Sequence, residues 1–172
     1  MEDFLQQIEK ALEYNLYYLA LQAVLTLPDI CSSLLSPTPE NRPVTKEYID
    51  WCNKNFSSKE KISSEDCYYF RCSMLHEGQT QHSRSNYKRI MFIEPGHPFS
   101  NMLNNISFQM NDTDKPSIDI NLNTFCSDMI SSVRKWWSAH QDEPVVQDNY
   151  KNMVKRYPNG LPPYIVGIPI IS

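Results

Sequence analysis

Arg71 and His76 lie five positions apart and have the chemistry needed to handle a phosphodiester. Histidine exchanges protons near neutral pH, because its unperturbed pKa is close to 6.5. The planar guanidinium of arginine binds phosphate oxygens at two points. The pair is therefore a candidate for phosphate binding combined with proton transfer. The structural alternative is that Arg71 pairs with a buried carboxylate and His76 lies against carbonyls at a helix C-terminus, where a cation is favoured.

The segment 63–78, SSEDCYYFRCSMLHEG, is predicted to be the helix that carries both side chains. Ser63 or Ser64 can serve as its N-cap, and two acidic residues follow in the first turn, where the helix dipole favours them. Gly78 is a natural left-handed terminator. Aromatic and aliphatic side chains on more than one side of this helix indicate that it is well buried.

The run RCSMLH matches the R-x4-H signature, and the chain resembles the HEPN superfamily of helical ribonucleases and toxins over its first half. The resemblance implies a metal-independent endoribonuclease of toxin or phage-defence type. It assigns His76 as acid/base or orienter of the ribose 2′-hydroxyl, and Arg71 as phosphate clamp. Many active members carry a polar residue, often asparagine, directly after the arginine; here that position is Cys72.

Helix geometry places Arg71 and His76 about 140° apart, because five residues turn by about 100° each. A long arginine can wrap partly around the helix. The family resemblance also implies a homodimer, in which two R-x4-H helices face across a shared cleft. An RNA substrate and an antitoxin or regulatory protein are the expected partners. The rival hypothesis is a non-catalytic helical module for dimerisation or protein interaction, which Cys72 and the net negative charge favour.

Two further groups are candidates to support such a site. Asp29 is expected at the start of a short helix, where its carboxylate either orients the arginine and histidine or is only a first-turn charge. A polar, basic loop directly after the motif is the candidate RNA-binding patch, with a solvated loop of mixed charge as the alternative. The candidate RNA-binding residues are His82, Arg84, Tyr87, Lys88 and Arg89.

Composition excludes several classes of protein. The 172 residues carry 16 basic and 20 acidic side chains, a net charge of −4, so any contact with RNA must come from a local patch. An acidic start and an apolar run at 16–27 that is too short to span a bilayer favour a cytoplasmic protein without a membrane partner. Five cysteines without a CxxC pair indicate reduced thiols. No metal or cofactor is predicted, because the cysteine and histidine spacings match no common zinc site and only 4 glycines are present.

The predicted fold is α+β and mostly α, in one domain spanning 1–172. Its first part, 1–79, is a HEPN-like antiparallel four-helix bundle with helices at 2–26, 29–35, 44–56 and 63–78. Pro28 is expected in the first turn of the second helix, and Thr45 is the expected cap of the third. The tyrosines at 14, 17 and 18 broaden the apolar stripe of the first helix, so its second half is expected to be buried more completely.

The second part, 80–172, is predicted to be a small sheet, a helix and a proline-rich tail. A small antiparallel sheet is expected from the β-leaning runs 90–93, 106–110 and 118–122. A C-terminal helix should begin at Asn123 or Thr124, end near Pro144 and pack back on the bundle. The tail is expected to pack as extended coil.

Overall fold

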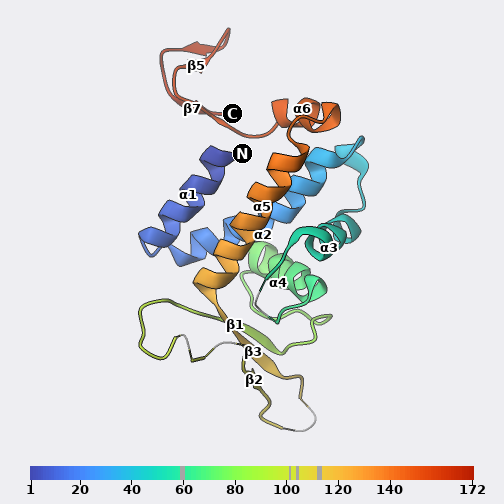
Figure 1. Cartoon of the computed structure of the whole chain (residues 1–172), viewed down its shortest axis with the longest axis vertical. Helices are drawn as coiled ribbons and strands as arrows, with labels where there is room; N and C mark the ends of the chain where they lie inside the picture. Colours follow the sequence, from blue (N-terminus) through green and yellow to red (C-terminus); the bar gives the residue numbers. More distant parts are fainter. Residues whose placement is uncertain (59–60, 101, 104, 112–113) are drawn as a thin grey trace.

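The computed structural model describes residues 1–58, 61–100, 102–103, 105–111 and 114–172. Its architecture is α+β with helices dominant, as the sequence predicts (Figure 1). Helix α2 (Tyr17–Leu35) is central and packs against α1 (Glu2–Glu13), α3 (Val44–Asn55), α4 (Ser64–Glu77), α5 (Leu122–His140) and α6 (Pro144–Lys151). The sheet lies at one end of this bundle and the C-terminal tail at the other. The arrangement places the motif helix α4 directly against α2.

The prediction of one helix over 2–26 is wrong, because the chain breaks between α1 and α2. Asn15 adopts a left-handed backbone (φ 59), which asparagine tolerates better than most residues. The second half of the predicted helix instead continues without interruption to Leu35, with Pro28 in its interior. A proline inside a helix costs about 3 kcal/mol. Ten buried residues in α2 supply packing that outweighs this cost.

Helix α2 is 19 residues long with a mean hydropathy of 1.4, so by length and composition alone it is long enough to cross a membrane. More than half of the most apolar 18-residue stretch of this helix is buried inside the bundle. Such burial is typical of the core helix of a soluble protein.

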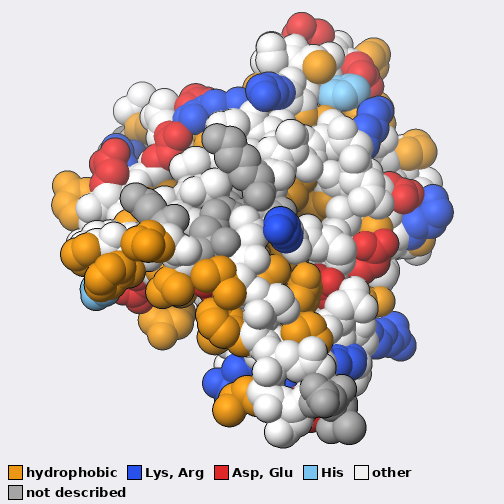
Figure 2. Space-filling view, turned by 60° about the horizontal axis from the view of Figure 1, so that its bottom comes forward, with side chains coloured by type: hydrophobic (Ala, Val, Ile, Leu, Met, Phe, Trp, Pro, Cys, Tyr) orange, Lys and Arg blue, Asp and Glu red, His pale blue; other side chains and the backbone are white. Residues whose placement is uncertain are grey.

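Two of the tyrosines expected to broaden the apolar stripe instead face solvent at the corner between α1 and α2. Tyr14 and Tyr18 are 75% and 80% exposed, while Tyr17 is partly buried and donates a hydrogen bond to Asn15. Further exposed apolar side chains follow β1, among them Met102 and Met110. Figure 2 shows hydrophobic side chains gathered along the left of the face that it presents.

Helix α4 has the predicted limits and caps. The Ser63 side chain accepts a hydrogen bond from the backbone N–H of Asp66, and Gly78 ends the helix with φ 64. Helix α3 differs from expectation at its start. Its N-cap is Pro43, and the Thr45 hydroxyl lies 2.7 Å from the hydroxyl of Tyr68 on α4. The side chain expected to cap α3 therefore helps join it to α4.

The sheet is mixed, so the prediction of an antiparallel sheet is wrong for one of its two ladders. Strand β1 (Arg89–Ile93) pairs in parallel with β3 (Ser117–Asn121), and β2 (Ser107–Phe108) pairs antiparallel with β3. The order β1-β3-β2 follows from the long connection 94–116, which leaves room for a crossover that returns the chain in the same direction. The inner face of this sheet is buried and carries the side chains of Ile90, Ile118 and Ile120.

Strand β3 runs directly into α5, whose N-cap is Asn121; the expected start at 123 or 124 is one or two residues late. Helix α5 packs along α2, which confirms that the C-terminal helix returns to the bundle. It ends at His140, and Pro144 begins α6 where a terminator of α5 was expected.

The tail is more ordered than extended coil and forms two antiparallel ladders. One joins β4 (Arg156–Tyr157) to β7 (Ile170–Ile171), and the other joins β5 (Gly160–Leu161) to β6 (Ile165–Val166).

Candidate functional site

The structure brings Asp29, Arg71 and His76 together where α4 packs against α2. A terminal nitrogen of Arg71, Nη2, forms an ion pair with the Asp29 carboxylate. The other, Nη1, lies 3.4 Å from Nε2 of His76. The side chains of Arg71 and Asp29 are 16% and 10% exposed, whereas His76 is exposed to solvent. The guanidinium thus joins a buried carboxylate to a surface imidazole.

Wrapping of the arginine resolves the angular separation expected from helix geometry. The two Cβ directions diverge by about 140°, yet the length of the arginine lets its guanidinium reach the histidine one turn further along α4. The sequence prediction allowed for this wrapping. The structural alternative is that Arg71 pairs with a buried carboxylate and that His76 lies against carbonyls at the helix end. The first part of it is present, because Arg71 pairs with Asp29. His76, by contrast, faces the guanidinium.

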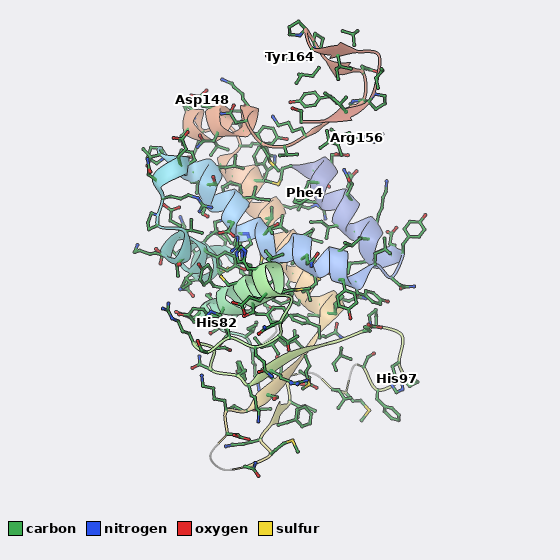
Figure 3. All side chains as sticks on the ribbon, turned by 180° about the vertical axis from the view of Figure 1, so that it is seen from behind. Phe4, His82, His97, Asp148, Arg156 and Tyr164 are labelled. Atoms are coloured by element: carbon green, nitrogen blue, oxygen red, sulfur yellow. The ribbon has the colours of Figure 1, made fainter. Side chains whose placement is uncertain are left out.

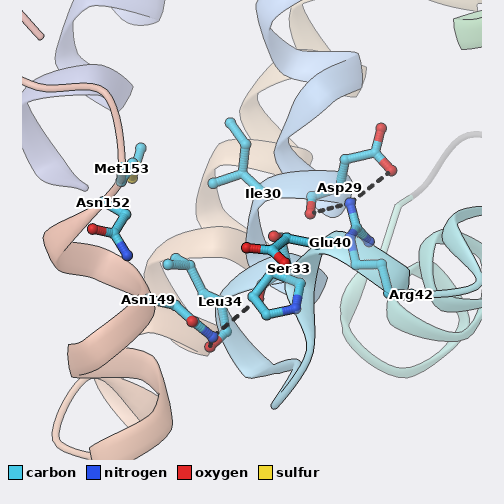
Figure 4. Close-up of a pocket in the computed structure, with 10 residues that line it drawn as sticks. Asp29, Ile30, Ser33, Leu34, Glu40, Arg42, Asn149, Asn152 and Met153 are labelled. Atoms are coloured by element: carbon cyan, nitrogen blue, oxygen red, sulfur yellow. Dashed lines mark hydrogen bonds and ion pairs between the residues drawn. The ribbon is translucent and has the colours of Figure 1, made fainter.

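Arg42 is a fourth member of the cluster, and the sequence prediction missed it. Its Nη2 donates to the backbone carbonyl of Asp29 at 3.1 Å and lies 3.8 Å from the carboxylate Oδ1 (Figure 4). Its Nη1 donates to Ser32 Oγ at 2.9 Å and to Glu47 at 3.2 Å. Arg42 comes from the proline-rich connection between α2 and α3, which carried no sequence signal beyond being a loop.

Burial and charge act in opposite directions on this cluster. Burial raises the pKa of Asp29 above its usual value, although Arg71 and Arg42 oppose the shift. Burial lowers the pKa of Arg71, but the Asp29 carboxylate and Cys72 more than reverse this, so that its pKa ends above the ordinary value. Arg71 is therefore a fixed cation held by a desolvated carboxylate.

Cys72 lies beside the cluster, as its position after the arginine requires. Its sulfur is 3.9 Å from Arg71 Nη1, within reach of a weak hydrogen bond from that nitrogen. Cys72 is partly exposed, whereas the four other cysteines are buried; all five are free thiols. A thiol is a softer and weaker acceptor than an amide or hydroxyl oxygen.

Asp29 and Arg42 also line a cavity of about 420 Å³ between α2, α6 and the connection 36–43 (Figure 4). Asn149 of α6 closes one wall. Its amide nitrogen donates to the carbonyls of Ser33, Leu34 and Ser36 at the end of α2. Arg71 and His76 are not among the residues that line this cavity.

The predicted RNA-binding residues fall into two sets. His82, Tyr87 and Lys88 line one cavity of about 720 Å³, together with Lys115 from the turn before β3. Lys88 is paired there with Asp114 at 3.0 Å. Arg84 and Arg89 are exposed and lie outside its lining. Lys115 was missed because it is distant in sequence from the motif.

Within the described ranges, no cluster of three or more histidine, cysteine, aspartate or glutamate side chains could hold a metal ion. The site joins an acid, a guanidinium and an imidazole on two packed helices, with the second guanidinium of Arg42 reaching Asp29 from the connection between α2 and α3. Comparison of the chain with family models, with curated proteins and with solved structures gave no match.

Proposed function

We propose that the protein is a HEPN-like endoribonuclease of toxin or phage-defence type that acts in the cytoplasm and needs no metal. The observation that supports it is the contact among Asp29, Arg71 and His76, with the imidazole at the surface. Arg71 and His76, whose chemistry suits phosphodiester cleavage, meet Asp29 at one point although the three residues come from two separate helices. The resemblance of RCSMLH to the R-x4-H signature supplies the reaction class.

Each side chain has a defined part in this reaction. His76 takes the proton of the ribose 2′-hydroxyl as its oxygen attacks the adjacent phosphorus. Arg71 offers Nη1 to a phosphate oxygen and stabilises the charge that builds up on the phosphorane-like transition state. Asp29 holds Nη2 and so fixes the plane of the guanidinium. The P–O5′ bond breaks, the leaving oxygen gains a proton, and the products carry a 2′,3′-cyclic phosphate and a 5′-hydroxyl.

A second copy of the chain completes the proposed site. One imidazole accepts the proton of the 2′-hydroxyl, and a second acid must protonate the leaving oxygen. A two-fold axis would place His76 of the partner subunit on the other side of the phosphate. The proposal therefore requires a homodimer, and a neutralising or regulatory protein would bind at or near the shared cleft.

The test is cleavage of RNA in EDTA by the purified protein and by the His76→Ala and Arg71→Ala variants. The proposal predicts cleavage by the parent and a loss of at least about a hundredfold in each variant, since general acid–base catalysis and charge stabilisation contribute at that scale. Equal activity in all three would contradict it and indicate a contaminant. Measuring the mass in solution tests the dimer, because a strict monomer provides only half of the site.

A non-catalytic dimerisation or interaction module is the second candidate. It is favoured by the ion pair itself, because Asp29 already neutralises Arg71 and the chain as a whole carries −4. This candidate predicts a dimer or a stable partner complex without RNA cleavage by the parent. The same two measurements therefore separate the candidates.

A further inference from the structure

We infer that the 720 Å³ cavity beside the C-terminal part of α4 binds a nucleobase of single-stranded RNA, which stacks on the ring of His82. The inference deepens the proposed function and rests on it for the identity of the ligand. The cavity lies between the last turn of α4, the loop 79–88 and the turn before β3. Its lining combines the rings of His82 and Tyr87, two glutamine amides and four charged side chains.

The ring of His82 is held in place before any ligand arrives. It stacks on Tyr69 of α4, with ring centroids 4.7 Å apart and planes within 8° of parallel. Its Nδ1 accepts a hydrogen bond from the backbone N–H of Arg84 at 3.1 Å, which leaves the proton of the neutral ring on Nε2. A base that stacks on the ring would therefore meet a preformed platform, with little entropy lost in ordering it.

The loop that carries this ring is anchored by the buried Asp66 of α4. Its carboxylate accepts hydrogen bonds from Ser85 Oγ at 2.7 Å and from the backbone and side-chain nitrogens of Asn86 at 2.7 and 3.0 Å. From the other wall, Lys115 donates to the carbonyl of Ser83 at 3.0 Å. The cavity is thus built from fixed backbone, unlike a solvated loop of mixed charge.

The platform is aligned with the proposed catalytic histidine. Tyr69 and His76 are seven residues apart on α4, which is about two turns, so they project from the same face of the helix about 10 Å apart along its axis. Ser73, between them, donates to the carbonyl of Gln81 at 2.8 Å and holds the loop against that face. A strand whose scissile phosphate lies at His76 can therefore place a neighbouring base on His82.

The charge of the cavity favours a base over a phosphate. Its two lysines, Lys88 and Lys115, are balanced by Glu77 and Asp114, and Lys88 is already paired with Asp114. Phosphate binding would have to break this pair, whereas a neutral base would not. The amides of Gln79 and Gln81 can donate to and accept from the edge of a base. The phosphate contacts then remain with Arg71.

The test measures binding apart from cleavage. A fluorescein-labelled, mixed-sequence single-stranded RNA is titrated with the His76→Ala protein. The same titration is then made with double variants that combine His76→Ala with His82→Ala, His82→Phe or His97→Ala. His97 is the matched control, because it is also a loop histidine beside an aromatic ring but lies on the opposite side of the sheet end (Figure 3). We expect His82→Ala to weaken binding about tenfold, since one base–aromatic stack contributes on that scale. His82→Phe and His97→Ala should bind as the His76→Ala parent does.

The inference is overturned if the parent binds no RNA, if His82→Ala binds as tightly as the parent, or if His97→Ala loses as much affinity. The proposed function fails separately. Should the wild-type protein cleave no RNA while binding still depends on the ring at 82, the base site stands and the nuclease does not. Conversely, if the wild-type protein cleaves RNA but substitution of His82 leaves RNA affinity unchanged, only the base site is refuted.

Discussion

Substitution of the two partners in the Asp29–Arg71 pair should have unequal effects on stability. Burial raises the pKa of Asp29, so its ionised form is disfavoured by the fold even beside two arginines. Asp29→Asn removes that cost along with the attraction, and we expect a change in unfolding free energy within about 1 kcal/mol at neutral pH. Arg71→Gln leaves the desolvated carboxylate without its nearer cation. It should cost about 2–3 kcal/mol, somewhat less than the loss of one partner from a fully buried pair, because 16% of the Arg71 side chain is exposed.

A double-mutant cycle with urea unfolding followed by circular dichroism measures this asymmetry. In the Asp29→Asn background, Arg71→Gln should cost less than about 1 kcal/mol, which gives a coupling near 2 kcal/mol. The matched control is the exposed pair Lys46–Asp50, whose side chains are 76% and 59% exposed; Asp50→Asn should change stability by less than about 0.5 kcal/mol. A coupling below about 0.5 kcal/mol, or an Asp29→Asn cost equal to that of Arg71→Gln, would refute the reasoning.

Three further predictions concern the elements around the site. Burial tends to raise the pKa of Asp66, but hydrogen bonds from Asn86 and Ser85 outweigh burial and lower this pKa. The stability that the Asp66 carboxylate contributes is therefore present above pH 3.8 and is lost as the pH falls through the folded pKa. Acid unfolding of the Asp66→Asn variant should lack this pH-dependent loss. Asn149→Ala should cost about 1–2 kcal/mol in thermal unfolding, because it removes three hydrogen bonds from the end of α2. Arg134→Ala should cost less than about 1 kcal/mol, with the effect shrinking in high salt, because Glu2 is exposed and the side chains of Arg134 and Glu9 are more than a third exposed.

The sequence predicted best those features that depend on neighbouring residues. Helix α4 has the expected cap at Ser63 and terminator at Gly78, since both act within one turn of the helix. The helix break at Asn15 was missed because the apolar spacing continues across it. Pro28 was misplaced for a related reason: burial of α2 on several sides, which no local pattern reports, outweighs the local preference of proline for a helix start.

The site was predictable where chemistry identified the residues and not where tertiary structure selected them. Arg71 and His76 stand out by type and spacing, and contact of Asp29 with them was one of two alternatives for its carboxylate. Arg42 reaches Asp29 only because the connection between α2 and α3 folds back along α2. Lys115 belongs to the cavity near His82 only because β3 lies beside β1 in parallel, a pairing that the alternating pattern of the strands did not distinguish from an antiparallel one.

The most direct measurement of the central claim is the chemistry of the RNA ends. RNA incubated with the protein in EDTA should yield fragments that end in 2′,3′-cyclic phosphate and begin with a 5′-hydroxyl, as determined by mass spectrometry. A substrate methylated at the 2′-oxygen should resist cleavage, and the His76→Ala variant should give no such fragments. Fragments with a 5′-phosphate, cleavage of the methylated RNA, or the same products from the variant would contradict a nuclease built on Arg71 and His76.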